Sequence, residues 1–373
     1  MKILFITGSL QPGKDGVGDY CRLLACELQK RVSYVHIVSL YDKNVETILE
    51  EEQCIGEAKI KTTRIPWSSK LASRIEVYCS LQAQYEFSLI SFHYVPYAYH
   101  SRGLPIWLVS FLKKTKQKTV FQIMLHELWI GFGTQSPLKH QIVGFFQQRI
   151  LKKIISVLKP KYITTSNYLY QSILQKAGID SKVINLFSNI PFLFQSESDW
   201  ERLNKKFESN LFKSANCTIG IFGYIHPEAN LLATIADVIK ATEDSETDFA
   251  VLSFGRQGAL GELYWDELKL AFKQDSQVKF ERLGLLEAPE VSYILQNINL
   301  AISCTPAAFI GKSGVYAAFR SHNVPVVMSN NEVIPGLESA SKENLEKAVN
   351  LPSGAYRVEY VAKEFLKIIN QTN

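Results

Sequence analysis

The sequence lacks the paired cysteines that mark a metal-binding or disulfide-stabilised fold. Its six cysteines form no CxxC pair and share no spacing typical of metal ligands; they are Cys21, Cys26, Cys54, Cys79, Cys217 and Cys304. Scattered cysteines of this kind are expected to be reduced thiols that pack as small hydrophobic side chains. An Asp-x-Asp pair that could hold a divalent cation is also absent, so we expect no metal site.

A long hydrophobic run is missing as well. Residues 104–112 form the most apolar stretch and number nine, whereas a transmembrane helix needs roughly 20. Residues 1–6 run directly into the pattern of a buried strand, which leaves no room for a targeting segment. We therefore expect a cytoplasmic protein that is soluble or peripheral on the inner face of the plasma membrane.

Two functional classes lose support because their motifs are absent. The spacing GxGxxG does not occur after the first strand pattern, which argues against a dinucleotide oxidoreductase. Neither an aromatic-rich basic motif nor a Cys/His finger occurs, so nucleic acid is not an expected partner.

The chain has 373 residues, more than the roughly 250–300 that one hydrophobic core supports, so two domains are expected. The net charge of +5 is unevenly distributed: residues 1–190 contain 24 Lys and Arg against 13 Asp and Glu, and the remainder contains 17 against 23. A basic half joined to an acidic half indicates that the first half faces something anionic, such as a membrane surface, a lipid diphosphate or a charged glycan.

Apolar runs alternate with amphipathic segments in both halves, which predicts βαβ units around parallel sheets. In the first half the pattern predicts helices at 16–31 and 138–158 and strands at 2–7, 34–40, 87–92, 119–125, 162–165 and 183–187. In the second half it predicts helices at 228–242, 260–272, 288–296 and 313–321 and strands at 217–222, 249–254, 278–280, 300–304 and 324–328. Residues 195–216 are polar and are interpreted as a linker, and residues 356–369 as a final amphipathic helix.

This organisation predicts an α/β fold with two doubly wound, Rossmann-like domains that face an interdomain cleft. The expected domains are residues 1–195 and 215–355, followed by a C-terminal helix at 356–373 that packs back on the first domain. Dehydrogenases, phosphoglycerate-type kinases and GT-B glycosyltransferases share this plan, so the fold alone does not choose a function.

Glycines and polar side chains follow the predicted strands. Gly16 and Gly18 open the first helix, where backbone amides favour an anion; a flexible turn capped by Asp15 or Asp19 is the structural alternative. His93 ends one strand and His126 the next, and His126 is followed directly by Glu127. We interpret His93 as structural and His126 with Glu127 as candidate catalytic residues, because a neutral imidazole suits proton handling or sugar binding.

Five short motifs in the first half occur in a recognisable order. They are GVGDY at 16–20, FHYVPYAYHSRGLP at 92–105, HELW at 126–129, TSNY at 165–168 and SNIP at 188–191. Together they resemble the acceptor domain of family 4 glycosyltransferases, the retaining GT-B enzymes of bacterial polysaccharide and glycolipid synthesis. The resemblance covers most of the chain and implies sugar transfer from a UDP- or GDP-sugar to a glycan or lipid-linked acceptor, without a cofactor.

The second half resembles the donor domain of that family, with departures. The run GIFGYIHPEAN at 220–230 is similar to the first strand and loop of the domain, so Gly223 is expected near the donor, but Tyr224 and Ala229 stand where relatives carry cations. Arg256, in the next glycine turn, is a candidate replacement; a solvated loop arginine is the alternative.

The family's two glutamates, eight residues apart, would fall on Ile310 and Ala318. Instead, Lys312, Ser313 and Gly314 open a helix, where amides, a hydroxyl and an ammonium group together favour a diphosphate. A capped helix with a surface lysine is the alternative interpretation. The missing glutamates also leave open a glycosyltransferase-like binding or scaffold protein that has lost turnover.

Lysine clusters at 113–118 and 152–161 are typical of a solvated surface. The first follows Trp107 and Leu108, so a Trp/Leu face with a lysine fringe on an anionic bilayer is the alternative.

Overall fold

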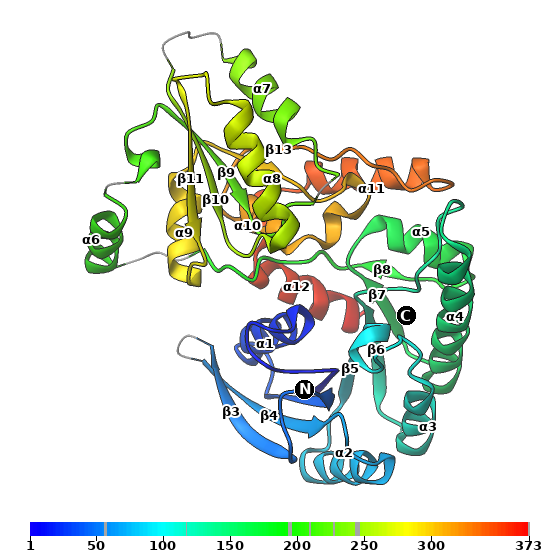
Figure 1. Cartoon of the computed structure of the whole chain (residues 1–373). Coiled ribbons are helices and arrows are strands. Elements are labelled where there is room, and N and C mark those ends of the chain that lie inside the picture. Colours follow the sequence, from blue (N-terminus) through cyan, green and yellow to red (C-terminus); the bar gives the residue numbers. More distant parts are fainter. Residues whose placement is uncertain are drawn as a thin grey trace. The chain divides into compact units, whose positions relative to one another are not determined.

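The computed structural model contains two compact units, coloured by sequence in Figure 1. Unit 1 comprises Met1–Asn185, Pro335–Leu337 and Val358–Asn373, and unit 2 comprises Leu186–Ile334 and Glu338–Arg357. The structure describes residues 1–55, 58–116, 118–192, 196–208, 210–226, 228–242 and 247–371.

Among the described residues, unit 1 is built on an eight-stranded sheet in the order β3-β4-β2-β1-β5-β6-β7-β8, in which β3 and β4 pair antiparallel and the other pairs are parallel. Its strands are β1 (Lys2–Thr7), β2 (Tyr34–Asp42), β3 (Leu49–Ile55), β4 (Ala58–Pro66), β5 (Leu89–Tyr94), β6 (Val120–Leu125), β7 (Tyr162–Thr165) and β8 (Lys182–Val183). The central strand β1 pairs Ile3 with Val35 of β2 and with Leu89 of β5. Its apolar run is buried on both sides, as the sequence predicted.

The β3–β4 hairpin is a feature that the sequence pattern did not predict. Strand β3 contains Glu50, Glu51 and Glu52, which have low strand propensity, and it forms the exposed edge of the sheet. Charged residues on an edge strand discourage pairing with another chain. Local propensity therefore did not indicate this strand, which depends on its pairing with β4.

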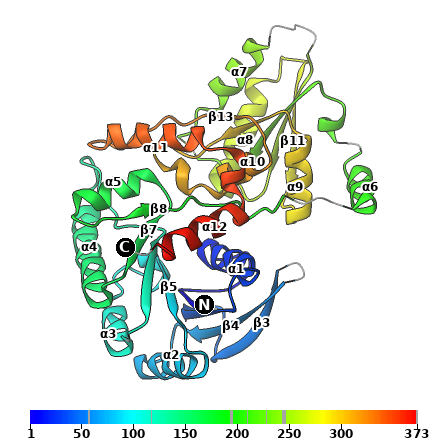
Figure 2. The same cartoon turned by 180° about the vertical axis from the view of Figure 1, so that it is seen from behind.

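Helices cover both faces of the unit 1 sheet. They are α1 (Gly16–Gln29), α2 (Leu71–Tyr85), α3 (Ile106–Thr115), α4 (Leu138–Leu158), α5 (Tyr168–Lys176) and α12 (Val358–Ile369). Figures 1 and 2 show α12 beside α1. Phe365 of α12 meets the ring of Phe5 at 6.1 Å, and the Tyr162 hydroxyl donates to the carbonyl oxygen of Ile369. The last helix is thus part of the core of unit 1.

Unit 2 contains a five-stranded parallel sheet in the order β11-β10-β9-β12-β13. The strands are β9 (Cys217–Phe222), β10 (Phe249–Phe254), β11 (Val278–Gly284), β12 (Leu300–Ser303) and β13 (Val326–Met328). The helices are α6 (Glu197–Lys206), α7 (Leu231–Ala241), α8 (Gly258–Ala271), α9 (Ala288–Asn297), α10 (Gly314–Ser321) and α11 (Glu338–Asn350), and a 3-10 helix η3 (Ala307–Lys312) precedes α10.

Alternate residues of β10 explain why its sequence is continuously apolar. Ala250, Leu252 and Phe254 pack into one hydrophobic cluster, whereas Phe249 and Val251 pack into another. Successive side chains of a strand point to opposite faces, so both faces of this sheet are buried.

The segment interpreted as a polar linker, 195–216, contains a helix. Its first residue, Gln195, lies outside the described residues. Ser196 caps α6 by accepting a hydrogen bond from the Asp199 amide, and Trp200 meets the ring of Tyr293 on α9 at 4.8 Å. The pattern was missed because α6 buries only one side chain completely, that of Leu203.

Across the parts of the chain that the structure describes, no helix combines the length and the apolar character needed to cross a membrane.

Gly144 of α4 allows this helix to approach the loop after β6. A Cβ atom at this position would overlap the carbonyl oxygen of Ile130. We predict that Gly144→Ala lowers the free energy of unfolding by about 1–3 kcal/mol, because the overlap outweighs the roughly 1 kcal/mol gain in helix propensity. Urea unfolding measures this change. Gly354→Ala is the control, since nothing lies within 4 Å of its Cβ position; equal effects of the two substitutions would contradict close packing at Gly144.

Candidate functional site

The described part of unit 2 contains a pocket at the carboxyl ends of two adjacent strands, β9 and β12. Its volume is about 450 Å³, within the range of small-molecule sites. Strands β10 and β11 lie on one side of β9, and β12 and β13 lie on the other, so strand order reverses where β9 meets β12. Doubly wound sheets bind ligands at such a reversal, because the segments that follow the two strands leave toward opposite faces.

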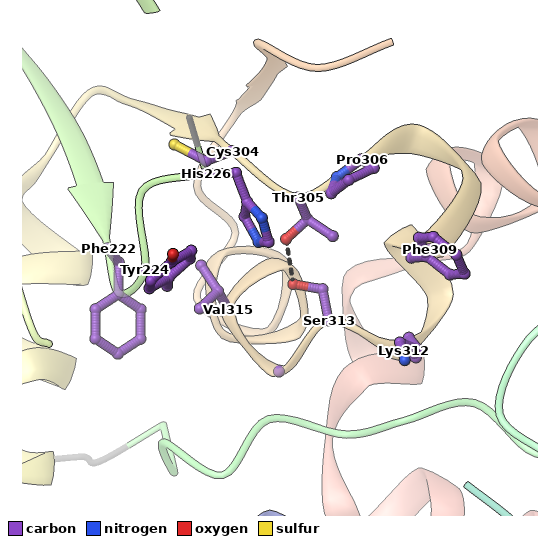
Figure 3. Close-up of a pocket in the computed structure, with 11 residues that line it drawn as sticks. Phe222, Tyr224, His226, Cys304, Thr305, Pro306, Phe309, Lys312, Ser313 and Val315 are labelled. Atoms are coloured by element: carbon purple, nitrogen blue, oxygen red, sulfur yellow. Dashed lines mark hydrogen bonds between the residues drawn. The ribbon is translucent and has the colours of Figure 1, made fainter. Parts of the chain in front are cut away.

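Three segments line the pocket, and their side chains are drawn in Figure 3. Phe222 ends β9, and Tyr224 and His226 follow it; Cys304, Thr305 and Pro306 follow β12; and Phe309, Lys312, Ser313, Gly314 and Val315 come from η3 and the start of α10. Figure 3 shows Phe222 and Tyr224 on one flank of the α10 N-terminus and Phe309 and Lys312 on the other. The lining thus combines aromatic rings with a few polar groups.

The N-terminus of α10 supplies hydrogen-bond donors to this pocket. Ser313 caps the helix by accepting from the amide of Tyr316 at 3.1 Å, and its hydroxyl lies 2.8 Å from that of Thr305. The first amide groups of a helix, here those of Gly314 and Val315, have no acceptor within the helix. These amides and the helix dipole favour a negatively charged ligand.

The Lys312 ammonium group lies beside this helix terminus, 5.3 Å from the centre of the Phe309 ring. Lys312 ends η3 and precedes the cap, so it lies just before the helix rather than in its first turn. Burial raises the pKa of the neighbouring Cys304 thiol to about 12. Cys304 is therefore protonated at neutral pH and is not a nucleophile.

The residues predicted near the donor are distributed unevenly around the pocket. Lys312, Ser313 and Gly314 line it. Gly223 lies between two lining residues, with φ of 78°, and its Cβ would meet Val315 at 3.0 Å. Arg256 is exposed on the loop between β10 and α8 and is not a lining residue. Its contact with the donor stays a prediction.

The sequence reasoning did not select His226 or Thr305, which also line the pocket. Each follows the carboxyl end of a correctly predicted strand, β9 or β12. The rule that singled out His93 and His126, polar residues at the carboxyl end of a parallel strand, finds both only if it is extended to the first four residues after the strand.

Ile310 and Ala318, the positions at which the resemblance to family 4 would place glutamates, belong to the core. Their side chains are buried, and neither lines the pocket. Ile310 packs with Tyr316 and Tyr356, and Ala318 packs with Phe254 and the β12 side of the sheet. An ionised carboxylate at either position would be buried among apolar groups at a large energetic cost.

Gly16 and Gly18 begin α1 in unit 1, and they differ in environment. Asp15 caps α1 by accepting from the Gly18 amide at 2.7 Å. A Cβ on Gly18 would lie 2.6 Å from the carbonyl oxygen of Ser9, whereas a Cβ on Gly16 would meet nothing within 4 Å. Packing accounts for Gly18, and Gly16 leaves the helix terminus open.

A chain of buried hydrogen bonds crosses strands β5, β6 and β7 and ends at His126. Nε2 of His126 lies 2.9 Å from Nδ1 of His93, and Nε2 of His93 lies 3.0 Å from Oγ of Ser91. Ser91 donates to Oε1 of Gln122, whose Nε2 donates to Thr164 at 2.6 Å. His93 was predicted to be structural, and in the folded protein its two ring nitrogens contact Ser91 and His126.

The donor directions in this chain assign the protons on both histidines. The single hydroxyl proton of Ser91 is used toward Gln122, so Ser91 Oγ accepts from Nε2–H of His93. Neutral His93 then accepts at Nδ1 from Nε2–H of His126. Nδ1 of His126 is therefore left as a hydrogen-bond acceptor. Glu127, the other candidate catalytic residue, is half-buried directly after His126.

Burial lowers the pKa of His126 to about 3, and burial together with His126 lowers that of His93 well below its usual value. Both imidazoles are neutral at pH 7, so His126 does not serve as a general acid there. The pKa values of both histidines in the folded protein lie below about 6.5, the pKa of a histidine in the unfolded chain. Stability contributed by these neutral histidines is therefore present above pH 6.5 and decreases as the pH falls below it.

The described residues include no group of three or more His, Cys, Asp or Glu side chains arranged to hold a metal ion.

We predict that His93 and His126 remain neutral, with their protons on Nε2, at about pH 5, because burial opposes their protonation. Nitrogen-15 correlation spectra of the imidazoles report both charge and tautomer. Ser91→Ala removes the acceptor for His93 Nε2–H and should shift the tautomer of His93 and, through it, that of His126. The exposed His140 provides a reference signal. A charged His126 at this pH, or Nδ1–H in the unaltered protein, would refute the assignment.

A scan against protein-family models gives no match, and a search of curated proteins also gives none. Solved structures do resemble the chain. The HepE protein of Anabaena, in complex with UDP and glucose, has 15% identity and a TM-score of 0.55, with 99% of each chain covered. A glycosyltransferase from Rickettsia africae has 11% identity and a TM-score of 0.55, with 100% of this chain and 99% of that chain covered.

The catalytic domain of starch synthase IV from Arabidopsis thaliana, bound to ADP and acarbose, has 12% identity and a TM-score of 0.53. This likeness covers 99% of the present chain and 98% of the other. At these identities the likeness to solved structures shows the fold alone. The predicted fold class is confirmed: the chain has the α/β GT-B fold of glycosyltransferases, with two Rossmann-like domains.

Proposed function

We propose that this protein is a glycosyltransferase that moves a sugar from a UDP- or GDP-sugar to a glycan or lipid-linked acceptor. The observation that carries the proposal is the pocket of unit 2, where an aromatic lining, a lysine and a helix N-terminus converge at the strand-order reversal. A nucleoside diphosphate needs all three, because its base stacks on aromatic rings while its diphosphate needs cations and amide donors.

The chemistry of the pocket suits departure of a diphosphate. As the bond between the anomeric carbon and the diphosphate oxygen breaks, negative charge grows on that oxygen. Lys312 and the amides of Gly314 and Val315 are assigned to stabilise this charge without a metal ion or cofactor. The acceptor hydroxyl forms the new bond to the anomeric carbon, and its proton passes to the departing phosphate. The resemblance to family 4 favours retention of configuration.

Unit 1 is assigned to the acceptor, which its basic composition also favours if the acceptor carries a lipid diphosphate. Neutral His126 offers an acceptor atom, Nδ1, to a sugar hydroxyl. Such a contact orients the sugar and moves no proton.

A binding protein without turnover is the second candidate, and the burial of Ile310 and Ala318 is the observation that favours it. Both candidates predict nucleotide binding in unit 2. Only the first predicts release of free nucleoside diphosphate when a nucleotide-sugar and an acceptor are supplied together.

We predict that Lys312→Ala weakens binding of UDP or GDP roughly 10- to 150-fold, which corresponds to about 1.5–3 kcal/mol for a charge-assisted hydrogen bond. Isothermal titration calorimetry measures the affinity, and thermal unfolding checks the fold. Lys342→Ala, an exposed lysine on α11 of the same unit, is the matched control. His126→Ala should keep the donor affinity and lower kcat. Unchanged affinity in folded Lys312→Ala protein would place the diphosphate elsewhere.

We also predict that turnover persists in excess chelator, because the leaving diphosphate is held by protein groups. Release of nucleoside diphosphate is followed with and without EDTA. Loss of activity that manganese or magnesium restores would disprove a metal-independent reaction.

A further inference from the structure

We propose that α4 docks unit 1 onto the surface of an anionic lipid bilayer. This helix exposes four large apolar side chains in its first nine residues: Leu138 is 71% exposed, Ile142 52%, Phe145 50% and Phe146 52%. Residues spaced by three or four positions lie on one face of a helix. Exposed apolar groups gathered on one helix face indicate a contact with an apolar phase or with another protein.

Cations continue the same face toward the end of the helix. At 100° per residue, Arg149, Lys152 and Lys153 fall with the four apolar residues inside an arc of about 120°, along about 22 Å of helix. All three cations are exposed. The Arg149 guanidinium lies 4.7 Å from the centre of the Phe145 ring, so the charged and apolar parts of the face adjoin. We call these seven residues the α4 face.

Acidic side chains are absent from α3 and α4 and scarce in the segment around them. Helix α4 contains no Asp or Glu, and neither does its neighbour α3, which packs against it. Residues 1–100 contain 11 basic and 11 acidic side chains, whereas residues 101–190 contain 13 basic and two acidic ones, Glu127 and Asp180. The positive excess of unit 1 therefore originates in the segment that contains α3, α4 and α5.

Helix α3 lies beside α4 and has the same distribution of apolar and charged residues along its length. Both α3 and α4 follow parallel strands and return antiparallel to them, so the two helices run in the same direction. Ile106, 66% exposed, lies at the N-terminal end of α3, and the exposed Lys113 and Lys114 lie at its C-terminal end. Apolar residues thus occupy one end of the helix pair, and lysines the other.

The structure corrects the earlier interpretation of a Trp/Leu face on α3. Leu108 is buried, and Trp107 is half-buried, with Nε1 donating to the carbonyl oxygen of Tyr99 and the Arg74 guanidinium 4.8 Å from its ring. These side chains pack inside unit 1, so the apolar contact with a bilayer is assigned to α4.

A bilayer matches the α4 face better than a second copy of the chain does. An apolar group inserted at the headgroup boundary, beside cations that meet anionic headgroups, is the arrangement of interfacial helices. Contact between two α4 faces would instead bring the cations of both copies into one interface, with no carboxylate on α3 or α4 to compensate them. The inference does not depend on glycosyl transfer, since docking requires neither a donor nor turnover.

Helix α8 of unit 2 provides a matched control. It exposes Leu263 by 64% and Leu270 by 70%, similar to the α4 residues, but it carries carboxylates at Glu262, Asp266 and Glu267. Arg282 forms ion pairs with Glu262 and Asp266, and with Lys269 included this group keeps a net negative charge, which an anionic surface repels. The two helices thus present comparable apolar exposure with opposite charge.

Cosedimentation of the full chain with vesicles tests the proposal. The vesicles contain either phosphatidylcholine alone or equal parts of phosphatidylglycerol and phosphatidylcholine. We expect binding to the anionic vesicles that weakens as salt rises from about 0.1 M to 1 M, because the Debye length shrinks from about 10 Å to 3 Å. Ile142→Gln with Phe146→Gln, and separately Lys152→Gln with Lys153→Gln, should each weaken partitioning roughly tenfold or more.

Leu263→Gln with Leu270→Gln on α8 should leave vesicle binding unchanged. All substituted side chains are exposed, so matching thermal midpoints are expected and verify folding. Equal binding to both vesicle types, no binding to either, or full binding by the folded α4 variants would overturn the proposal. So would a dimer in sedimentation velocity that Ile142→Gln with Phe146→Gln dissociates, because the α4 face would then be an interface between copies. Retained nucleotide affinity in the α4 variants separates this result from the donor-site proposal.

Discussion

The reversal of strand order between β9 and β12 is the constraint on which the pocket of unit 2 depends. Because β10 and β12 lie on opposite sides of β9, the segments after β9 and β12 turn toward opposite faces of the sheet. The space between them is lined by Tyr224 and His226 from one segment and by Thr305 and the start of α10 from the other. A helix that begins at such a place directs its unpaired amides toward whatever enters.

The two units differ in how they use polar groups. In unit 2 the candidate site relies on backbone amides, one ammonium group and aromatic rings, and Ile310 and Ala318 belong to the core. In unit 1 a chain of buried hydrogen bonds runs from His126 to Thr164, and each side chain in it donates to the next. Nδ1 of His126 remains as an acceptor atom at the beginning of this chain. A neutral histidine held in one tautomer binds a hydroxyl group by geometry, whereas a histidine with an ordinary pKa would change charge near neutral pH.

Charge is organised on a larger scale than these sites. The segment 101–190 carries nearly all of the positive excess of unit 1, and α4 combines it with an exposed apolar stripe. Such a stripe is unusual on a protein surface that faces water, because burying four large apolar side chains would be favourable. The proposed contact with an anionic bilayer thus belongs to unit 1 and depends on apolar burial and cations. The proposed contact with a diphosphate belongs to unit 2 and depends on backbone amides and Lys312.

Much of the fold could be predicted from the sequence. Short runs rich in apolar, aromatic and β-branched residues predicted the bounds of β1, β7, β9 and β10 to the residue, because a strand buried on both faces leaves a local signal. The positions of Lys312, Ser313 and Gly314 after β12 followed from the same alternation. The edge hairpin β3–β4 and helix α6 were not predicted. Strand β3 depends on its pairing with β4, which itself pairs with the distant strand β2, and α6 depends on its packing against α9. Only the tertiary structure could show that His126 adjoins His93, that Trp107 is packed inside unit 1, or that the outward face of α4 is apolar, because each depends on neighbours brought together by folding.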